Sequence, residues 1–161
     1  MTDIAARAGF MPENLTRSDS APGPGSGPEK ALAELHTRLL DTIQGFEKVR
    51  EKAEPEFRPI AIEFHALHLR QAESVARMLS AMGHDPETDG SIFGTVNSAV
   101  VTVRSWFDDV STNIMDSLIQ GEKHVLDAYG AAISALDDPL RRRQLEADRQ
   151  DLVALLDRHA G

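Results

Sequence analysis

The chain has 161 residues, and its 17 basic and 26 acidic side chains give a formal net charge of −9. This length suits one compact domain with a tail, and the acidic balance argues against a nucleic-acid-binding surface. Cysteine is absent, which excludes disulfides, thiol nucleophiles, thiolate zinc sites and iron–sulfur clusters, and no apolar run approaches the roughly 18 residues of a membrane span.

Residues 1–28 are predicted to form a disordered tail. Nine of the eleven residues from Ser18 to Pro28 are Gly, Pro or Ser, a composition that buries too little apolar surface to order itself. The alternative is a short tethered peptide that docks on a partner. Residues 1–17 lack the basic start, apolar core and cleavage site of a secretory signal, so we expect a cytoplasmic protein. The folded domain is then expected to span residues 29–161.

Four long stretches of this domain have the three- and four-residue apolar spacing of amphipathic helices. They cover residues 29–54, 57–82 and 111–136, and a last helix that begins after a cap at Asp137 or Asp138, with Pro139 in its first turn. Gly83 is predicted to end the second helix as a glycine C-cap. The side chains expected to face the core are Leu32, Leu35, Leu39, Ile43, Phe46, Val49, Phe64, Val75, Leu79, Met82, Met115, Leu118, Val125, Tyr129, Ala132, Leu140, Leu145, Leu152 and Leu155.

No segment alternates with a two-residue period, so the fold class is predicted to be all-α. Short connections make helices one and two antiparallel, and likewise the last two. Nearly thirty residues separate the two hairpins, and they include a short helix that carries Ile92, Val96, Val100 and Val103. Two antiparallel hairpins joined by such a long crossover predict a ferritin-like four-helix bundle.

Three motifs support the same fold by resemblance. They are DTIQGFEK from Asp41, MGHDPETDGSIFG from Met82 to Gly94, and QGEKHVLDAYGAAI from Gln120 to Ile133. In this order they resemble a bacterial family of ferritin-like four-helix-bundle proteins of unknown function, over about Lys30 to His159. The resemblance implies the bundle fold and implies no established activity.

Ferritin-like oxidases hold two irons with a Glu from each of two helices and a Glu-x-x-His pair from each of the others. No Glu in this chain has a His three residues further on, so the di-iron motif is absent and an enzyme is not the leading expectation.

A less standard metal site is an open alternative. His68 interrupts the apolar stripe of helix two, and Glu122 and Asp148 lie on the core faces of helices three and four. His68 and Glu122 are each twelve residues into helices that run parallel, so they should lie near one level. With His65, these residues are the predicted ligands of iron, manganese or zinc. The other interpretation is that His68 and Glu122 simply form a hydrogen bond that sets the register of the bundle.

Other polar residues carry weaker predictions. Tyr129 is expected to pack in the core with its hydroxyl near the surface. A second polar level near the other end of the bundle could combine Glu47, Glu63, Asp116 and His159.

The leading functional prediction is a non-enzymatic binding or assembly module that forms a homo-oligomer or binds a protein partner. Phe93, Trp106 and Phe107 in the crossover are candidates for its exposed apolar surface, unless the crossover packs back on its own bundle. The alternative is a metal-binding protein, with or without redox activity, that uses His68 and Glu122. Neither a nucleic acid nor a membrane is an expected partner.

Overall fold

The computed structural model describes residues 27–85 and 114–160. They form four helices, α1 (Pro28–Lys52), α2 (Arg58–Ala81), α5 (Ile114–Ala135) and α6 (Pro139–Ala160). No strand occurs in these two ranges, so the predicted all-α class is confirmed there. The predicted tail up to residue 26 and the predicted crossover helix with Phe93, Trp106 and Phe107 lie outside the described residues.

The ends of the helices follow from local backbone chemistry. Pro28, which the sequence analysis assigns to the tail, is the first residue of α1, because its fixed φ and missing N–H suit that position. Gly83 adopts a φ of 87°, and the amides of Gly83 and His84 donate to the carbonyls of Ser80 and Leu79 at 3.0 and 2.9 Å. The predicted glycine C-cap of α2 is therefore confirmed.

Asp138, and not Asp137, caps α6. Its Oδ1 accepts hydrogen bonds from the backbone amides of Leu140 at 2.8 Å and Arg141 at 3.3 Å. These two amides have no partner within the helix, so the side chain of Asp138 supplies the acceptor that the first turn lacks. The Arg141 guanidinium contacts Asp138 Oδ2 at 3.3 Å, which keeps a carboxylate beside this helix N-terminus.

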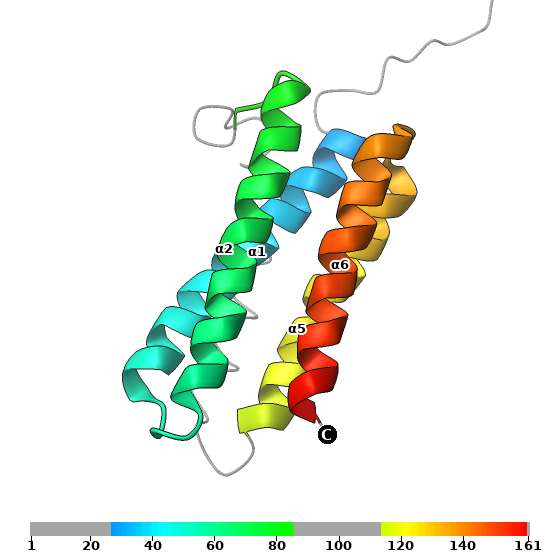
Figure 1. Ribbon diagram of the computed structural model, residues 1–161. Helices are drawn as coiled ribbons and strands as arrows, with labels where there is room; N and C mark the ends of the chain where they lie inside the picture. The colour runs from blue at the N-terminus through cyan, green and yellow to red at the C-terminus, as the bar shows by residue number, and fades with distance from the viewer. Residues whose placement is uncertain (1–26, 86–113, 161) are drawn as a thin grey trace, which may run out of the picture.

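The four helices pack in a square. Figure 1 shows α1 and α2 running in opposite directions, as do α5 and α6. Helix α1 packs against α2 and α5, and α6 packs against α5 and, less extensively, α2. Helices α2 and α5 are therefore diagonal to one another. They run in the same direction, since α2 ends at the end of the bundle opposite to the one where α5 begins (Figure 1).

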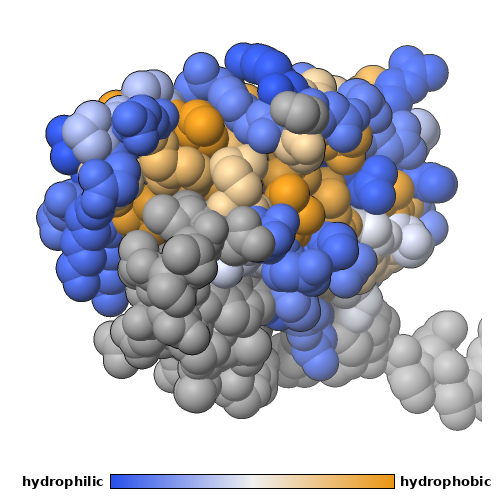
Figure 2. Space-filling model, turned by 90° about the horizontal axis from the view of Figure 1, so that it is seen from below, coloured by the Kyte–Doolittle hydropathy of each residue, from blue (hydrophilic) through white to orange (hydrophobic). Residues whose placement is uncertain are grey.

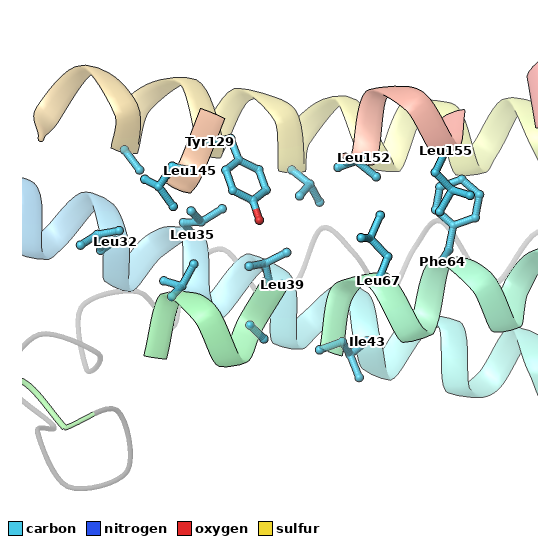
Figure 3. Packing of buried hydrophobic residues seen from close by; sticks show 14 of the residues in the cluster. Leu32, Leu35, Leu39, Ile43, Phe64, Leu67, Tyr129, Leu145, Leu152 and Leu155 are labelled. Carbon is cyan, nitrogen blue, oxygen red and sulfur yellow. The ribbon is translucent and has the colours of Figure 1, made fainter. Parts of the chain in front are cut away.

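One hydrophobic cluster fills the space between the helices (Figure 3). Most predicted core residues are buried, and Val49, Met82 and Met115 are partly buried against the cluster. The prediction for Leu140 is wrong, because this side chain is 76% exposed. Leu140 lies in the first turn of α6, and it is turned about 140° around the helix from Leu145, five residues further on. Leu67, Met78, Leu136 and Leu156 are also buried, although they are not among the predicted core residues.

Hydrophobic side chains also gather at one end of the bundle. Figure 2 shows the end where α1 turns into α2, with a hydrophobic centre and hydrophilic side chains around part of it. No helix in the described part of the chain is long and apolar enough to cross a membrane.

Candidate functional site

A histidine and a glutamate meet at the centre of the bundle. Nε2 of His68 on α2 lies 2.8 Å from Oε1 of Glu122 on α5, which is hydrogen-bond distance. The two side chains are 0% and 1% exposed. Because α2 and α5 are diagonal, this hydrogen bond crosses the middle of the core. The level argument from the sequence therefore places these two residues correctly.

The rings of two phenylalanines lie beside the His68 ring. Phe46 of α1 and Phe64 of α2 stack with ring centroids 5.5 Å apart, and the Phe46 ring lies 5.8 Å from that of His68. Such surroundings have a low local dielectric, which strengthens a hydrogen bond that is made and raises the cost of one that is broken. The pair is therefore expected to matter for the stability of the bundle.

The pair does not use all of its polar atoms. His68 Nδ1 and Glu122 Oε2 are buried and have no hydrogen-bond partner among the described residues. The same is true of Gln71 Oε1, Tyr129 Oη and Asp148 Oδ2. Buried polar atoms in native proteins usually have a partner, so several unpartnered atoms near one another indicate a place where something else can bind.

Asp148 lies on the face of α6 that packs toward α2. The amide of Gln71 donates to the backbone carbonyl of Asp148 at 2.6 Å, and the amide of Gln144 donates to Asp148 Oδ1 at 3.0 Å. Burial raises the pKa of Asp148, and side-chain hydrogen bonds from Gln144 and Ser74 oppose that shift. The pKa of Tyr129 is also raised, first by burial and then by the negative charges of Asp148 and Glu122.

His65 points away from this centre. Its Nε2 lies 3.5 Å from Glu47 Oε1, and its Nδ1 lies 3.4 Å from the guanidinium of Arg50. Both partners belong to α1, so His65 lies in the α1–α2 interface. It does not join His68, although the two are only three residues apart, because a step of three residues also turns the side chain by about 60°.

The four predicted ligands thus do not form one preassembled group. The structure brings His68 and Glu122 together, holds Asp148 by its own hydrogen bonds, and directs His65 toward α1. Within residues 27–85 and 114–160, no three or more His, Asp or Glu side chains are arranged to hold a metal ion.

The second predicted polar level is assembled only in part. Glu63 Oε2 lies 3.0 Å from His159 Nε2 and accepts from the guanidinium of Arg158 at 3.2 Å. The hydrogen bond with His159 lowers the pKa of Glu63. Glu47 pairs with His65 instead, and Asp116 is exposed. Glu63, Arg158 and His159 therefore link α2 to the end of α6 at the surface.

Gln71 is buried in the core without having been predicted there, and the predicted position of the Tyr129 hydroxyl is wrong. Gln71 lies three residues after His68, and this spacing on a helix could have marked it as a neighbour in the core. The hydroxyl of Tyr129 was expected near the surface, but it is buried (Figure 3). It points into the space between the helices rather than along the helix toward solvent.

Comparison with known families identifies the chain at the family level. Residues 28–135 match the family described as Domain of unknown function (DUF2383). The chain belongs to this family. The match includes α1, α2 and α5, and hence both His68 and Glu122, whereas Asp148 on α6 lies beyond it. No curated protein and no solved structure matches the chain.

Proposed function

We propose that this member of the DUF2383 family is a ferritin-like bundle that acts as a non-enzymatic assembly module. The helix directions support the ferritin-like topology of two hairpins and a long crossover, because α2 ends and α5 begins at opposite ends of the bundle (Figure 1). A connection between them must therefore travel its length. The acidic net charge supports a protein partner rather than a nucleic acid. We also propose that the protein acts in the bacterial cytoplasm.

The observation that carries the assembly function is an apolar strip on the outer side of α1 and α2. Leu40 of α1 and Ile62 and Leu69 of α2 are 42%, 46% and 47% exposed, and they are three of the four large exposed hydrophobic side chains in the described ranges. Ile62 and Leu69 are seven residues apart, so they lie on one face of α2.

The register of the two helices brings Leu40 to the same face. Phe46 stacks on Phe64, so residues of α1 and α2 whose numbers add to about 110 lie at one level. Leu40 is therefore level with Leu69. Leu40 also lies seven residues before Glu47, so the two share one face of α1. Glu47 contacts His65 of α2, so this face of α1 lies beside α2. Leu40, Ile62 and Leu69 thus form one exposed surface, named here the outer strip.

The occupant that we propose for the outer strip is a second copy of the chain. Oligomers with two-fold symmetry bury the same patch on both subunits, so one apolar surface serves both partners. Burying large half-exposed side chains removes apolar area from water, which favours association by roughly 25 cal/mol per Å² before the entropic cost of binding is subtracted.

Sedimentation equilibrium of the full chain over a wide concentration range tests this proposal. We expect a concentration-dependent dimer, and we expect the variant Ile62→Gln with Leu69→Gln to be a monomer of unchanged thermal stability. The matched control is Leu140→Gln, which alters a leucine that is more exposed and lies outside the strip. A wild-type chain that stays monomeric at all concentrations would overturn the assembly function.

A second candidate function is binding of iron, manganese or zinc. The observation that favours it is the His68–Glu122 pair, in which an imidazole and a carboxylate are already adjacent and each retains an unpartnered atom. Asp148 is the further carboxylate that we propose as a ligand, and His65 would have to change its side-chain direction to take part. Imidazole and carboxylate ligands together suit these three metals.

Metal analysis by mass spectrometry separates this candidate from the first. Untagged protein purified without chelators should then contain close to one metal ion per chain, and His68→Ala and Glu122→Ala should lose it. Glu73→Ala is the control, because Glu73 lies on the surface and pairs with Arg77. A chain that contains no metal and takes none up on reconstitution would exclude the second candidate and leave the assembly function untouched.

A further inference from the structure

Five polar side chains share the centre of the bundle and are incompletely hydrogen-bonded. They come from three helices that are far apart in the sequence: α2, α5 and α6. We name them the central polar cluster, which consists of His68, Gln71, Glu122, Tyr129 and Asp148.

Three links join these residues into one cluster. His68 bonds to Glu122, and the amide of Gln71 donates to the backbone of Asp148. Tyr129 lies seven residues after Glu122, on the same face of α5, and both side chains are buried. Figure 3 shows its hydroxyl directed into the interior between the helices, where the side chains of the two hydrogen-bonded pairs are also buried.

The unpartnered atoms call for a ligand that both donates and accepts hydrogen bonds. Glu122 Oε2, Asp148 Oδ2 and Gln71 Oε1 accept, whereas the hydroxyl of Tyr129 can do either. Water has this capacity, and buried waters typically make about three hydrogen bonds to such otherwise unsatisfied groups. A chain of this size is also expected to hold several buried waters, at about one per 27 residues.

We propose that the central polar cluster is an internal binding site for ordered water, which connects Glu122, Tyr129 and Asp148. This site is independent of the outer strip and of the assembly function. Its position beside the α2–α6 interface is consistent with exchange of the water with solvent, since Asp148 lies in that interface and α6 packs less extensively on α2 than on α5.

Removing the hydroxyl of Tyr129 tests the proposal by the sign of its effect. If the hydroxyl binds water, Tyr129→Phe loses a satisfied buried hydrogen bond and the unfolding equilibrium constant rises about fivefold. If the hydroxyl has no partner, the same change removes an unsatisfied polar group, and the variant is as stable as the wild type or more stable. The second result would overturn the proposal.

A direct measurement on the wild-type chain does not depend on the variant folding. Nuclear Overhauser contacts between bound water and the ring protons of Tyr129 beside its hydroxyl are expected, and their absence would overturn the proposal. Metal analysis of the same sample tests whether a metal ion, rather than water, occupies the central polar cluster. Close to one metal ion per chain, lost in Glu122→Ala, would also overturn the water assignment and would support the second candidate function instead.

Discussion

At the scale of single residues, the hydrogen bond between His68 and Glu122 is the feature with the largest expected consequence. Both side chains are fully buried beside aromatic rings. Replacing one partner leaves the other polar side chain buried without a hydrogen bond, which lowers stability. Replacing both with apolar groups leaves no buried polar side chain unpaired, so this loss of stability is avoided. The effects of the two substitutions on the free energy of unfolding are therefore expected to be strongly non-additive.

A double-mutant cycle measures this dependence. His68→Leu and Glu122→Leu are each expected to lower the free energy of unfolding by about 3 kcal/mol, because each leaves one buried polar group unpaired. The double variant is expected to be close to the wild type in stability, far from the sum of the two losses. Urea unfolding at neutral pH checks this, and additive losses would contradict it.

His36 makes the stability depend on pH. Burial lowers its pKa in the folded chain, so the unfolded chain, with a pKa of about 6.5, binds the proton more tightly. Its contribution to stability is therefore fully present above about pH 6.5 and is lost as the pH falls through that value. His36→Gln is expected to reduce the loss of stability between about pH 7.5 and pH 5.5.

The control for this measurement is His124→Gln, because His124 is exposed on α5. Urea unfolding at both pH values is compared among the three proteins. An identical loss of stability in the wild type and in His36→Gln would show that another group causes the loss of stability at low pH.

At the scale of single helices, the two glycines Gly83 and Gly130 give opposite expectations. Gly83 has a φ of 87°, a conformation that costs an L-residue roughly 1 kcal/mol or more. Gly130 lies inside α5, and an added Cβ would meet nothing within 4 Å.

Gly83→Ala is therefore expected to lower the free energy of unfolding by about 1 kcal/mol, and Gly130→Ala to raise it by about 0.5 kcal/mol or more. Each variant is the control for the other, since both add one methyl group. Thermal unfolding followed by circular dichroism checks the two signs, and equal shifts in the same direction would contradict the expectation.

At the scale of the whole molecule, the packing is uneven. Helix α1 packs extensively on α2, whereas α6 packs on α2 less extensively, and that smaller interface includes the polar contacts of Glu63 with Arg158 and His159 and of Gln71 with Asp148. Exposed ion pairs add little stability. The α2–α6 interface is therefore the place where the bundle is expected to open most easily.

The composition of residues 1–26 leads to a prediction for the complete chain. Because this glycine-, proline- and serine-rich stretch is expected to bury little apolar surface, deleting it should leave the thermal unfolding temperature of the bundle unchanged. Differential scanning calorimetry of the full and shortened chains makes the comparison. A large decrease in the shortened chain would mean that this segment packs on the bundle.

The four described helices and most of the core follow from the amino-acid sequence alone. Apolar residues that recur every three or four positions define a buried face whatever the surroundings, and Gly83, Asp138 and Pro139 act on the adjacent backbone. The level of His68 and Glu122 also followed from the sequence, because each residue advances a helix by a fixed 1.5 Å.

The contacts that these side chains make depend on how the helices pack together. A position on a helix leaves the side-chain direction open, and neighbouring helices select it. His65 contacts Glu47 and Arg50 because these side chains lie on the neighbouring helix α1. Leu140 is exposed to solvent at the end of α6, and Tyr129 is buried between the helices. The candidate site was thus predictable as a level of the bundle, while the hydrogen bonds within it depended on packing among helices distant in the sequence.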